Sequence, residues 1–295
     1  MTTEGPLRVG LVGAGPWAGL FHAPMLAGSD AVDLVGVWAR RPDQAAELAG
    51  RHGAEAVTDL DALFATCEAV AFAVPPDVQS DLAVRAADAG RHVLVEKPLG
   101  LDVAQARAVA HAVRANGVVS QLVLTNRYRP CVRSFIAEAA GFEVFGARAA
   151  SISGAIVGDG PFATPWRLAH GALLDVGPHV LDLLDAVVGP IVAIRGEGDP
   201  TRWIEITCTH EGGAVSQSSL SIATPVEASV LRWELYGPAG VLALDPSDTY
   251  DDFAAALAAI PAELAEAVRT GTQHPLDAAR GLYLQELLAG ALADR

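Results

Sequence analysis

The feature that most constrains the fold is a glycine-rich turn after the first apolar segment. Leu7–Val12 reads as a short strand, and the next residues follow the spacing G-x-G-x-x-A before a helical pattern and a second strand, Ala31–Trp38. In such a turn, glycines leave the backbone bare for a pyrophosphate, and the small last residue lets a helix pack on the strand. The segment therefore predicts a βαβ unit that binds a dinucleotide through Gly13, Gly15, Pro16, Trp17 and Ala18.

The pattern of strand followed by helix continues through the first 123 residues. The expected strands are Leu7–Val12, Ala31–Trp38, Glu55–Thr58, Ala69–Val74, His92–Lys97 and Val118–Thr125. Strands that alternate with helices are typical of a doubly wound parallel sheet. We therefore predict an α/β chain with a Rossmann domain over residues 1–123.

The residues after the second strand bear on the choice between NAD and NADP. An acidic side chain there would accept hydrogen bonds from the ribose 2′-hydroxyl and repel a 2′-phosphate. The chain has Ala39, Arg40 and Arg41 instead, and an arginine can bind a phosphate with two N–H groups. The alternative is that both arginines only begin the next helix on its solvent side. We expect NADP to be preferred, with NAD as the other candidate.

A proline pair follows the fourth strand. Val74 ends that strand, and Pro75 and Pro76 come next. Prolines stiffen a loop, so Val74 and Pro75 are candidate contacts for the cofactor. A plain turn is the equally simple alternative.

Lys97 is the only lysine, because every other basic residue among the 20 Lys and Arg is arginine. It follows Glu96 at the end of the fifth strand, where open α/β sheets place ligands. A desolvated lysine can lose its proton, which arginine does not do. One lysine can also survive by chance in an arginine-rich composition. The position favours a functional lysine, with Glu96 beside it at the cofactor.

The second half changes pattern and predicts a separate domain over residues 124–295. After a helix from Asn126 to Ala140, the expected strands are Val144–Gly154, Ile191–Gly198, Trp203–Thr209, Ala214–Ile222 and Ser229–Tyr236. Adjacent strands without helices between them indicate an antiparallel sheet, so this domain is α+β with a mainly antiparallel open sheet. Tyr250–Arg295 is expected to be helical, with breaks at Pro261 and at Gly271–Pro275.

One helix, Ala172–Val188, is predicted to interrupt these strands. Asp175, His179 and Asp182 lie on it four and three residues apart, which puts them on one helical face. Two such side chains could hold a metal, but no further His or Cys stands at a ligand spacing, so we expect no metal. A row of surface charges, a buried structural histidine and a proton-transfer group remain open.

Composition narrows the partners and the compartment. The net charge of −15 argues against a nucleic-acid surface. No apolar run approaches the ~20 residues of a membrane-spanning helix. The three cysteines, Cys67, Cys131 and Cys208, lack disulfide or zinc spacing, and the first residues lack a signal-peptide pattern. We expect a cytoplasmic protein with no membrane and no nucleic-acid partner.

The glycine turn, the proline loop and Glu96-Lys97-Pro98 together resemble the Gfo/Idh/MocA oxidoreductase family, which includes glucose–fructose oxidoreductase and inositol dehydrogenase. The D-x-G-x-H signature of that family matches Asp175–His179. The resemblance implies that Lys97 lies beside the nicotinamide, that the Lys97–Pro98 bond is cis, and that Lys97 faces Asp175 and His179 of the other domain. Two common family residues differ here: an Asn is Pro76, and a His is Gln79.

The resemblance implies an NAD(P)-dependent oxidoreductase that moves a hydride between nicotinamide and a hydroxyl or carbonyl carbon of a sugar, polyol or similar small molecule. A histidine, with an ordinary pKa near ~6.5, can exchange the hydroxyl proton at neutral pH. Asp175 would fix the tautomer of His179, and Lys97 would stabilise alkoxide character. We favour His179 as the base, although Lys97 is not excluded. Further candidate substrate contacts are Arg127, Trp166, Arg167 and Asp182.

The position of the single lysine bears on several other functions. The single lysine excludes a short-chain dehydrogenase, because the residue four before Lys97 is Val93 and not Tyr. It also excludes a Walker-type nucleotide site, which needs Gly-Lys-Ser/Thr. A non-catalytic cofactor or sugar sensor and an NAD-dependent glycoside hydrolase remain as alternatives, since both occur among relatives. The resemblance also implies a homodimer or homotetramer formed through the open sheet.

Overall fold

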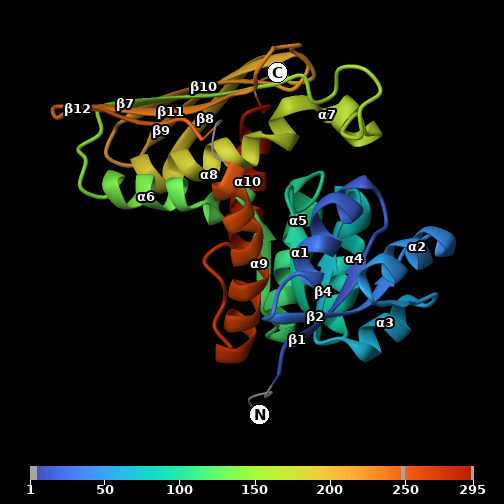
Figure 1. The fold of residues 1–295 in the computed structure, drawn as a ribbon. Coiled ribbons are helices and arrows are strands. Elements are labelled where there is room, and N and C mark those ends of the chain that lie inside the picture. The colour runs from blue at the N-terminus through green and yellow to red at the C-terminus, as the bar shows by residue number, and fades with distance from the viewer. Residues whose placement is uncertain (1–4, 247–249, 294–295) are drawn as a thin grey trace. The chain divides into compact units, whose positions relative to one another are not determined.

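The computed structural model describes residues 5–246 and 250–293 (Figure 1). Contacts divide the chain into two compact units. The first comprises Met1–Leu124 and Leu257–Tyr283, and the second comprises Thr125–Ala256 and Leu284–Arg295. This division differs from the one drawn on the sequence at residues 123 and 124, because a late segment, Leu257–Tyr283, belongs to the first unit.

The first unit contains a six-stranded parallel sheet in the order β3-β2-β1-β4-β5-β6. Its strands are β1 (Leu7–Val12), β2 (Val32–Trp38), β3 (Glu55–Ala56), β4 (Ala69–Phe72), β5 (His92–Glu96) and β6 (Ser120–Val123). The strand order reverses beside β1, between β1 and β4, and open α/β sheets bind ligands at the carboxyl ends of the strands next to such a reversal. The predicted Rossmann sheet is therefore confirmed, with the glycine turn at the reversal.

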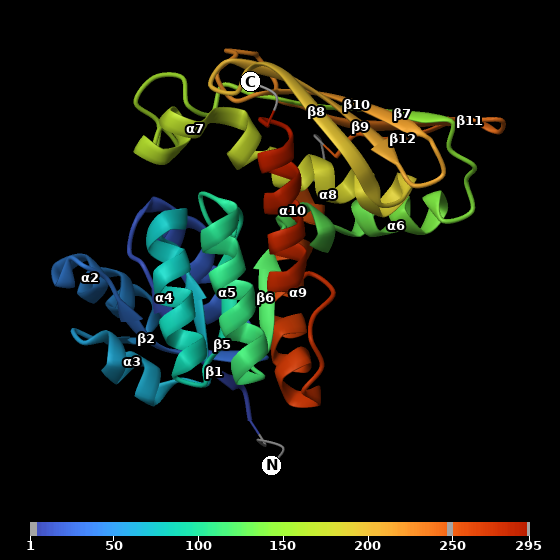
Figure 2. The ribbon, with the colours of Figure 1, turned by 180° about the vertical axis from the view of Figure 1, so that it is seen from behind.

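Helices cover both faces of this sheet. Figure 2 shows α4 and α5 side by side on one face, and Figure 1, from the opposite side, shows α1 in front of the other. The ends of α5 follow from its sequence: the Asp102 side chain accepts a bond from Gln105 N–H at 2.8 Å, and Gly117 closes the helix with φ 63°. The helices are α1 (Ala23–Ala27), α2 (Pro42–His52), α3 (Leu60–Thr66), α4 (Pro76–Asp88) and α5 (Val103–Asn116).

The edge strand β6 is covered by the late segment of the chain. The Leu122 N–H donates to the Leu276 carbonyl at 2.6 Å, and Gln121 Nε2 donates to the Ile260 carbonyl at 3.0 Å. The predicted break at Pro261 is wrong, because α9 (Tyr250–Thr270) runs through that proline. A proline removes one helical hydrogen bond, the one that would reach the carbonyl four residues earlier, and the rest of the helix continues through it. The predicted break at Gly271–Pro275 is confirmed, because it lies between α9 and α10 (Ala278–Gly290). The last two residues of the predicted helix, 294 and 295, lie outside the described residues.

The second unit contains a mixed, mostly antiparallel sheet in the order β12-β11-β7-β10-β9-β8. Only the β7–β10 pair is parallel among these described pairs. The helices of this unit, α6, α7 and α8, lie on one side of the sheet in both ribbon views (Figures 1 and 2). The strands are β7 (Gly146–Ile152), β8 (Ile191–Asp199), β9 (Trp203–His210), β10 (Val215–Ser221), β11 (Val230–Gly237) and β12 (Gly240–Leu244), and the helices are α6 (Pro130–Ala139), α7 (Pro165–Asp175) and α8 (Gly177–Val188).

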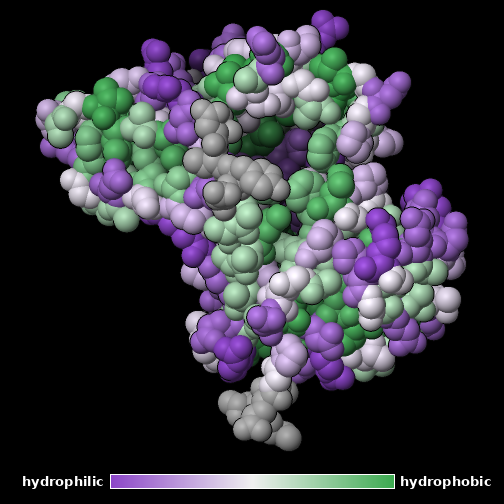
Figure 3. All heavy atoms as spheres, in the orientation of Figure 1, coloured by the Kyte–Doolittle hydropathy of each residue, from purple (hydrophilic) through white to green (hydrophobic). Residues whose placement is uncertain are grey.

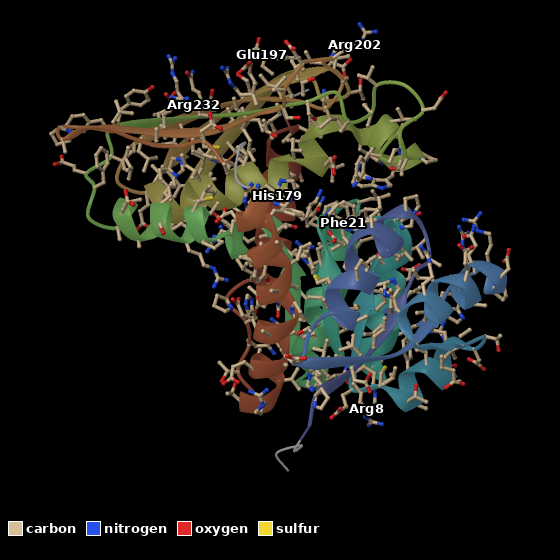
Figure 4. All side chains as sticks on the ribbon, in the orientation of Figure 1. Arg8, Phe21, His179, Glu197, Arg202 and Arg232 are labelled. Carbon is tan, nitrogen blue, oxygen red and sulfur yellow. The ribbon has the colours of Figure 1, made fainter. Side chains whose placement is uncertain are left out.

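The two faces of the second sheet differ in burial. Alternate side chains pack under the helices, and Trp233 of β11 is 0% exposed. Charged side chains such as Arg232 and Glu197 stand on the opposite face (Figure 4). The predicted α+β architecture with an open sheet is confirmed. In the described part of the chain, no helix combines the length and the apolar character needed to cross a bilayer.

The single helix predicted over Ala172–Val188 is wrong. α7 ends at Asp175 and α8 begins at Gly177, with Val176 between them at φ −106° and ψ −18°. Pro178 lies in the first turn of α8, where its missing N–H costs nothing, but inside a continuous helix it would break the hydrogen-bond ladder. Asp175 and His179 therefore lie on different helices and not on one uninterrupted face.

Candidate functional site

The glycine turn has the backbone geometry that its sequence predicts. Gly13 has φ 123°, and a Cβ at this position would lie 2.4 Å from the Ala73 carbonyl oxygen. Any other residue would strain the turn and push β1 away from the end of β4. Glycine is thus required here by the contact between two neighbouring strands.

Gly15 differs from Gly13 because no protein atom lies close to it. A Cβ at Gly15 would meet nothing within 4 Å, so the protein leaves open space over this residue. The helical run that starts here presents its first backbone N–H groups without helical partners, which is the usual site for a phosphate. The open space and these donors fit the pyrophosphate of a dinucleotide.

The proline loop lies against the same turn. A Cβ on Gly13 would also lie 3.1 Å from Val74 Cγ1, so the Val74 side chain contacts the turn. Pro75 then precedes α4 as its N-terminal flanking residue, and Pro76 begins the helix. Their fixed φ angles suit this abrupt start. The structure thus places Val74 against the glycine turn and Pro75 directly after it, at the start of α4.

Two exposed arginines follow β2. Arg40 and Arg41 are exposed, and Arg41 precedes Pro42 at the start of α2. Hydrophilic side chains gather over this helix in the space-filling view (Figure 3). No acidic residue stands between Trp38 and Pro42. Both guanidinium groups can therefore reach solvent beside the end of β2.

Glu96 lies at the centre of a buried hydrogen-bond network at the end of β5. Its Oε1 atom accepts from Trp17 Nε1 at 2.7 Å and pairs with His22 Nε2 at 2.8 Å, and its Oε2 atom accepts from the Lys97 N–H at 3.2 Å. Burial raises the pKa of Glu96, but the hydrogen bond and charge of His22, with Lys97 and Trp17, lower it further than burial raises it. The net pKa is below the ordinary glutamate value, so Glu96 is ionised at neutral pH.

Gln79 holds the backbone around Lys97. Its Nε2 donates to the Glu96 carbonyl at 2.7 Å and to the Pro98 carbonyl at 3.3 Å, and its Oε1 accepts from the Glu96 N–H at 2.7 Å. This glutamine stands where the family often has histidine. Its amide supplies a donor and an acceptor to the two residues that flank Lys97.

Lys97 is partly buried, and the Lys97–Pro98 peptide bond is cis, as the resemblance implies. The residue that sequence reasoning missed is His22, which is 1% exposed and reaches Glu96 from the segment after the glycine turn. In the sequence, His22 stands out only by lying four residues after Ala18, the last residue of the glycine turn. That spacing does not indicate that its partner is Glu96, 74 residues further along the chain.

In the second unit, Asp175 is held by Arg167. Arg167 Nε lies 3.1 Å from Asp175 Oδ1, which is an ion-pair distance, although the N–H direction does not meet the angle of a hydrogen bond. The same guanidinium lies over the Trp166 ring, 4.6 Å from its centroid, and over Phe162 at 5.7 Å. In the predicted Trp-Arg segment, the Arg167 guanidinium thus pairs with the Asp175 carboxylate and stacks on the Trp166 and Phe162 rings.

Arg127 and Asp182 contact each other. Arg127 Nη1 lies 2.9 Å from Asp182 Oδ2, and the Asp182 side chain is 1% exposed. Both were predicted to contact substrate. A buried carboxylate paired in this way balances the charge of Arg127, so any ligand of either residue competes with the ion pair.

His179 lies near the start of α8 and is partly buried. Figure 4 shows it on the side of α8 away from the sheet. Asp175 and His179 belong to the second unit and Lys97 to the first. Their meeting in one site, and the roles of all the residues named above, remain predictions.

Comparison with known proteins places both units. Residues 7–123 match the model described as "Oxidoreductase family, NAD-binding Rossmann fold", and residues 143–243 match the GFO/IDH/MocA C-terminal domain. A structure of GenD2 from gentamicin A biosynthesis, in complex with NAD, is 25% identical with a TM-score of 0.85, covering 100% of this chain and 96% of that one.

Two curated proteins are similar over shorter stretches. D-Glucoside 3-dehydrogenase of Escherichia coli is 31% identical over 201 residues, which is 63% of this chain and 55% of that protein. 4-Carboxy-2-hydroxymuconate-6-semialdehyde dehydrogenase of a Sphingobium species is 35% identical over 127 residues, which is 42% of this chain and 40% of that protein. The match thus spans about half the length of these relatives. With both domain models matched in order, the chain belongs to the Gfo/Idh/MocA oxidoreductase family.

Proposed function

We propose that the protein is an NAD(P)-dependent oxidoreductase acting on a hydroxyl or carbonyl group of a sugar, polyol or similar small molecule. The observation that carries this proposal is the buried Glu96 carboxylate, which accepts from Trp17 of the dinucleotide turn and from the backbone N–H of Lys97, the only lysine of the chain. The charge of Lys97 also helps to lower the pKa of Glu96, so the lysine side chain acts on a carboxylate that is bonded to the dinucleotide turn. The family and the names of its members support the same reaction class.

The residues of this chain divide the work of binding and proton transfer. The nicotinamide, when bound, accepts or supplies the hydride. Lys97 hydrogen-bonds the substrate oxygen and stabilises its alkoxide character, and His179 holds or releases the hydroxyl proton. Asp175, fixed by Arg167, orients the imidazole of His179. The second unit thereby supplies the proton relay, and the first supplies the lysine.

The substrate contacts are assigned to the residues around Asp175. The Trp166 ring and the Arg167 guanidinium offer a flat face and N–H donors, which suit a ring that carries several hydroxyl groups. Arg127 and Asp182 offer a donor and an acceptor at the cost of their own ion pair. Curated relatives that act on glucosides and inositol support a hydroxylated substrate.

NADP is proposed as the preferred cofactor. The exposed Arg40 and Arg41 can bind a 2′-phosphate, and no carboxylate follows β2 to accept bonds from a free 2′-hydroxyl. Titration of the protein with NADPH and NADH, followed by nucleotide fluorescence, tests this preference. The expected result is tighter NADPH binding that Arg40→Ala weakens about tenfold, while NADH binding is unchanged. Equal affinities, unaffected by the substitution, would contradict it.

The catalytic proposal is tested with a panel of polyols and glycosides, with NAD and NADP in turn. Lys97→Arg keeps the charge but neither the shape nor the readily lost proton. It is expected to lower kcat between about 10²-fold and 10⁴-fold while cofactor affinity stays within about twofold. Arg114→Lys, a change of the same kind at an exposed site on α5, is the matched control. Wild-type turnover by Lys97→Arg would remove Lys97 from the mechanism.

A homodimer or homotetramer is proposed to form through the outer face of the second sheet. Exposed apolar side chains occur on this sheet beside the charged ones, among them Val192, Trp203, Val230 and Val241. Light scattering coupled to size exclusion measures the mass directly. A monomer at micromolar concentration would contradict the assembly, and Val192→Arg is expected to weaken it.

A further inference from the structure

We propose that His22 is a positioning residue for Lys97, acting through the buried carboxylate of Glu96. The inference rests on the proposed role of Lys97 in proton handling. His22 touches neither cofactor nor substrate in this proposal. It fixes the charge and the orientation of the carboxylate that adjoins both the dinucleotide turn and the lysine.

A π-helical turn brings His22 to this position. The turn covers Ala18–His22, and its wide geometry is marked by the bond from the Ala23 N–H to the Ala18 carbonyl, five residues back. In an α-helix of 3.6 residues per turn, residues five apart point to sides about 140° apart. The wider turn reduces that angle, so Trp17 and His22 both reach the same Oε1 atom of Glu96. Single π-turns inside helices are frequent at functional sites.

The bonding pattern assigns the proton of His22. An ionised carboxylate can only accept hydrogen bonds, so His22 Nε2 must carry the hydrogen that it shares with Glu96 Oε1. Among the described residues, the Nδ1 atom of this ring has no hydrogen-bond partner. The titratable or charged groups that face Glu96 are His22 and Lys97, while Trp17 and Gln79 contribute neutral donors.

The network does more than hold the strand. The backbone of Glu96 is already fixed by the Gln79 amide, which pairs with both its N–H and its carbonyl. Removal of the His22 ring therefore leaves the end of β5 in place and acts on the carboxylate alone. His22 is also the first cause among those that lower the pKa of Glu96. Without it, Glu96 becomes protonated at a higher pH, and Lys97 loses its neighbouring negative charge there.

The first measurement uses the apo protein and the fact that Lys97 is the only lysine. Reductive methylation with ¹³C-formaldehyde gives one dimethyl-lysine signal, together with a separate signal from the α-amino group. In His22→Leu this lysine signal is expected to shift or broaden at pH 7, because the adjacent carboxylate has changed its charge or orientation. His22→Gln keeps an N–H donor and is expected to restore most of the wild-type signal.

His274→Leu is the matched control. His274 is also buried and pairs with a glutamate in the first unit, with Nε2 3.0 Å from Glu263 Oε2. Its loss removes a comparable buried pair without touching Glu96. It is expected to lower thermal stability and to leave the lysine signal unchanged. If the two leucine variants alter the lysine signal equally, His22 is only structural and the proposal is wrong.

The second measurement is the pH profile of kcat on any compound of the panel that is turned over. His22→Leu is expected to lower kcat between about tenfold and a hundredfold, as a small displacement of a reacting group does. It is also expected to move the acid limb of the profile to higher pH, with KM for the cofactor within about threefold. If His22→Leu does not fold, Glu96→Gln carries the test, because it is expected to lower kcat and to remove the Glu96 contribution to that limb, while His22→Gln is expected to keep the wild-type profile.

The two proposals fail in different ways. If Lys97→Arg turns over at the wild-type rate, the proposed function of Lys97 is wrong whatever His22 does. If Lys97 is essential but His22→Leu gives a wild-type profile and lysine signal, only the positioning role of His22 is wrong.

Discussion

The carboxylates of the candidate site are held in two different ways. In the first unit, Glu96 is bonded by an indole, an imidazole and a backbone N–H. In the second unit, Asp175 and Asp182 are each paired with an arginine. Arginine stays charged at any working pH, whereas the donors of Glu96 include a neutral indole and a backbone N–H.

The two units are therefore expected to respond differently to pH. Asp175 and Asp182 are each paired with an arginine, so their arrangement is expected to be insensitive to pH, and breaking either pair is expected to cost stability. Glu96 has a lowered pKa that depends on its hydrogen-bond donors and neighbouring charges, so its surroundings are expected to change when acid protonates the carboxylate. The following changes test that contrast, from the largest expected effect to the smallest.

The largest effect is expected from Arg127→Met in the second unit. The change leaves the buried Asp182 without its cation, and breaking a buried pair in this way costs about 3 kcal/mol of unfolding free energy. Urea denaturation measures the loss. The double variant Arg127→Met/Asp182→Asn removes both charges and is expected to recover most of it. A loss below about 1 kcal/mol in the single variant would show that the pair is not the main support of Asp182.

Glu96→Gln in the first unit is expected to cost about 2 kcal/mol at pH 7, the usual range for hydrogen bonds to a charged group. The pKa of Glu96 is lowered in the folded protein. Its ionised form therefore stabilises the fold above the unfolded pKa, and that contribution is lost as pH falls through the folded pKa. The wild type and the variant should converge in stability below about pH 4. A gap of constant size from pH 7 to pH 3, measured by urea denaturation, would contradict the sign of the shift.

Gly15→Ala tests whether the turn serves binding or folding. A Cβ there meets no atom within 4 Å, so the unfolding free energy should change by less than about 0.5 kcal/mol. NADPH affinity should nevertheless fall about tenfold, because the methyl group occupies the space over the turn. Gly50→Ala, also in open space on α2, is the control and should leave binding unchanged. Unaltered NADPH affinity in Gly15→Ala would place the pyrophosphate elsewhere.

The smallest effect is expected from Arg167→Lys. The charge opposite Asp175 is kept, but the planar group that stacks on Trp166 and Phe162 is lost. Cation–π contacts of this kind contribute about 0.5–1 kcal/mol. Arg167→Met, which also removes the charge, should destabilise clearly more in the same denaturation assay. Equal losses would mean that stacking, and not charge, holds Asp175.

The features that the sequence predicts correctly are those that depend on residues close to one another along the chain. The glycine turn, the strand that ends at Glu96 and the change to antiparallel strands are all read from local patterns. The break between Asp175 and Gly177 was missed although Pro178 is its local cause, because the spacing of the acidic residues and histidine favoured one helix.

The pairings inside the candidate site could not be predicted in the same way. His22 and Glu96 are 74 residues apart, and Arg127 and Asp182 are 55 apart. Such contacts depend on which elements the fold brings together, and no composition or periodicity encodes them. The sequence predicts Arg127 and Asp182 as separate substrate contacts and gives no sign that they pair with each other, as they do in the structure.

The covering of β6 has a consequence for the order in which the chain can fold. Gln121 and Ser120 find partners 139 and 153 residues later, in the segment around Ile260 and Gln273. A ribosome that has released the first 124 residues has made all six strands of the sheet but none of the segment that pairs with its last edge. An open strand edge invites pairing with other chains. The first unit therefore begins folding with an open strand edge, and it remains open to aggregation until the segment Leu257–Tyr283 has been synthesised.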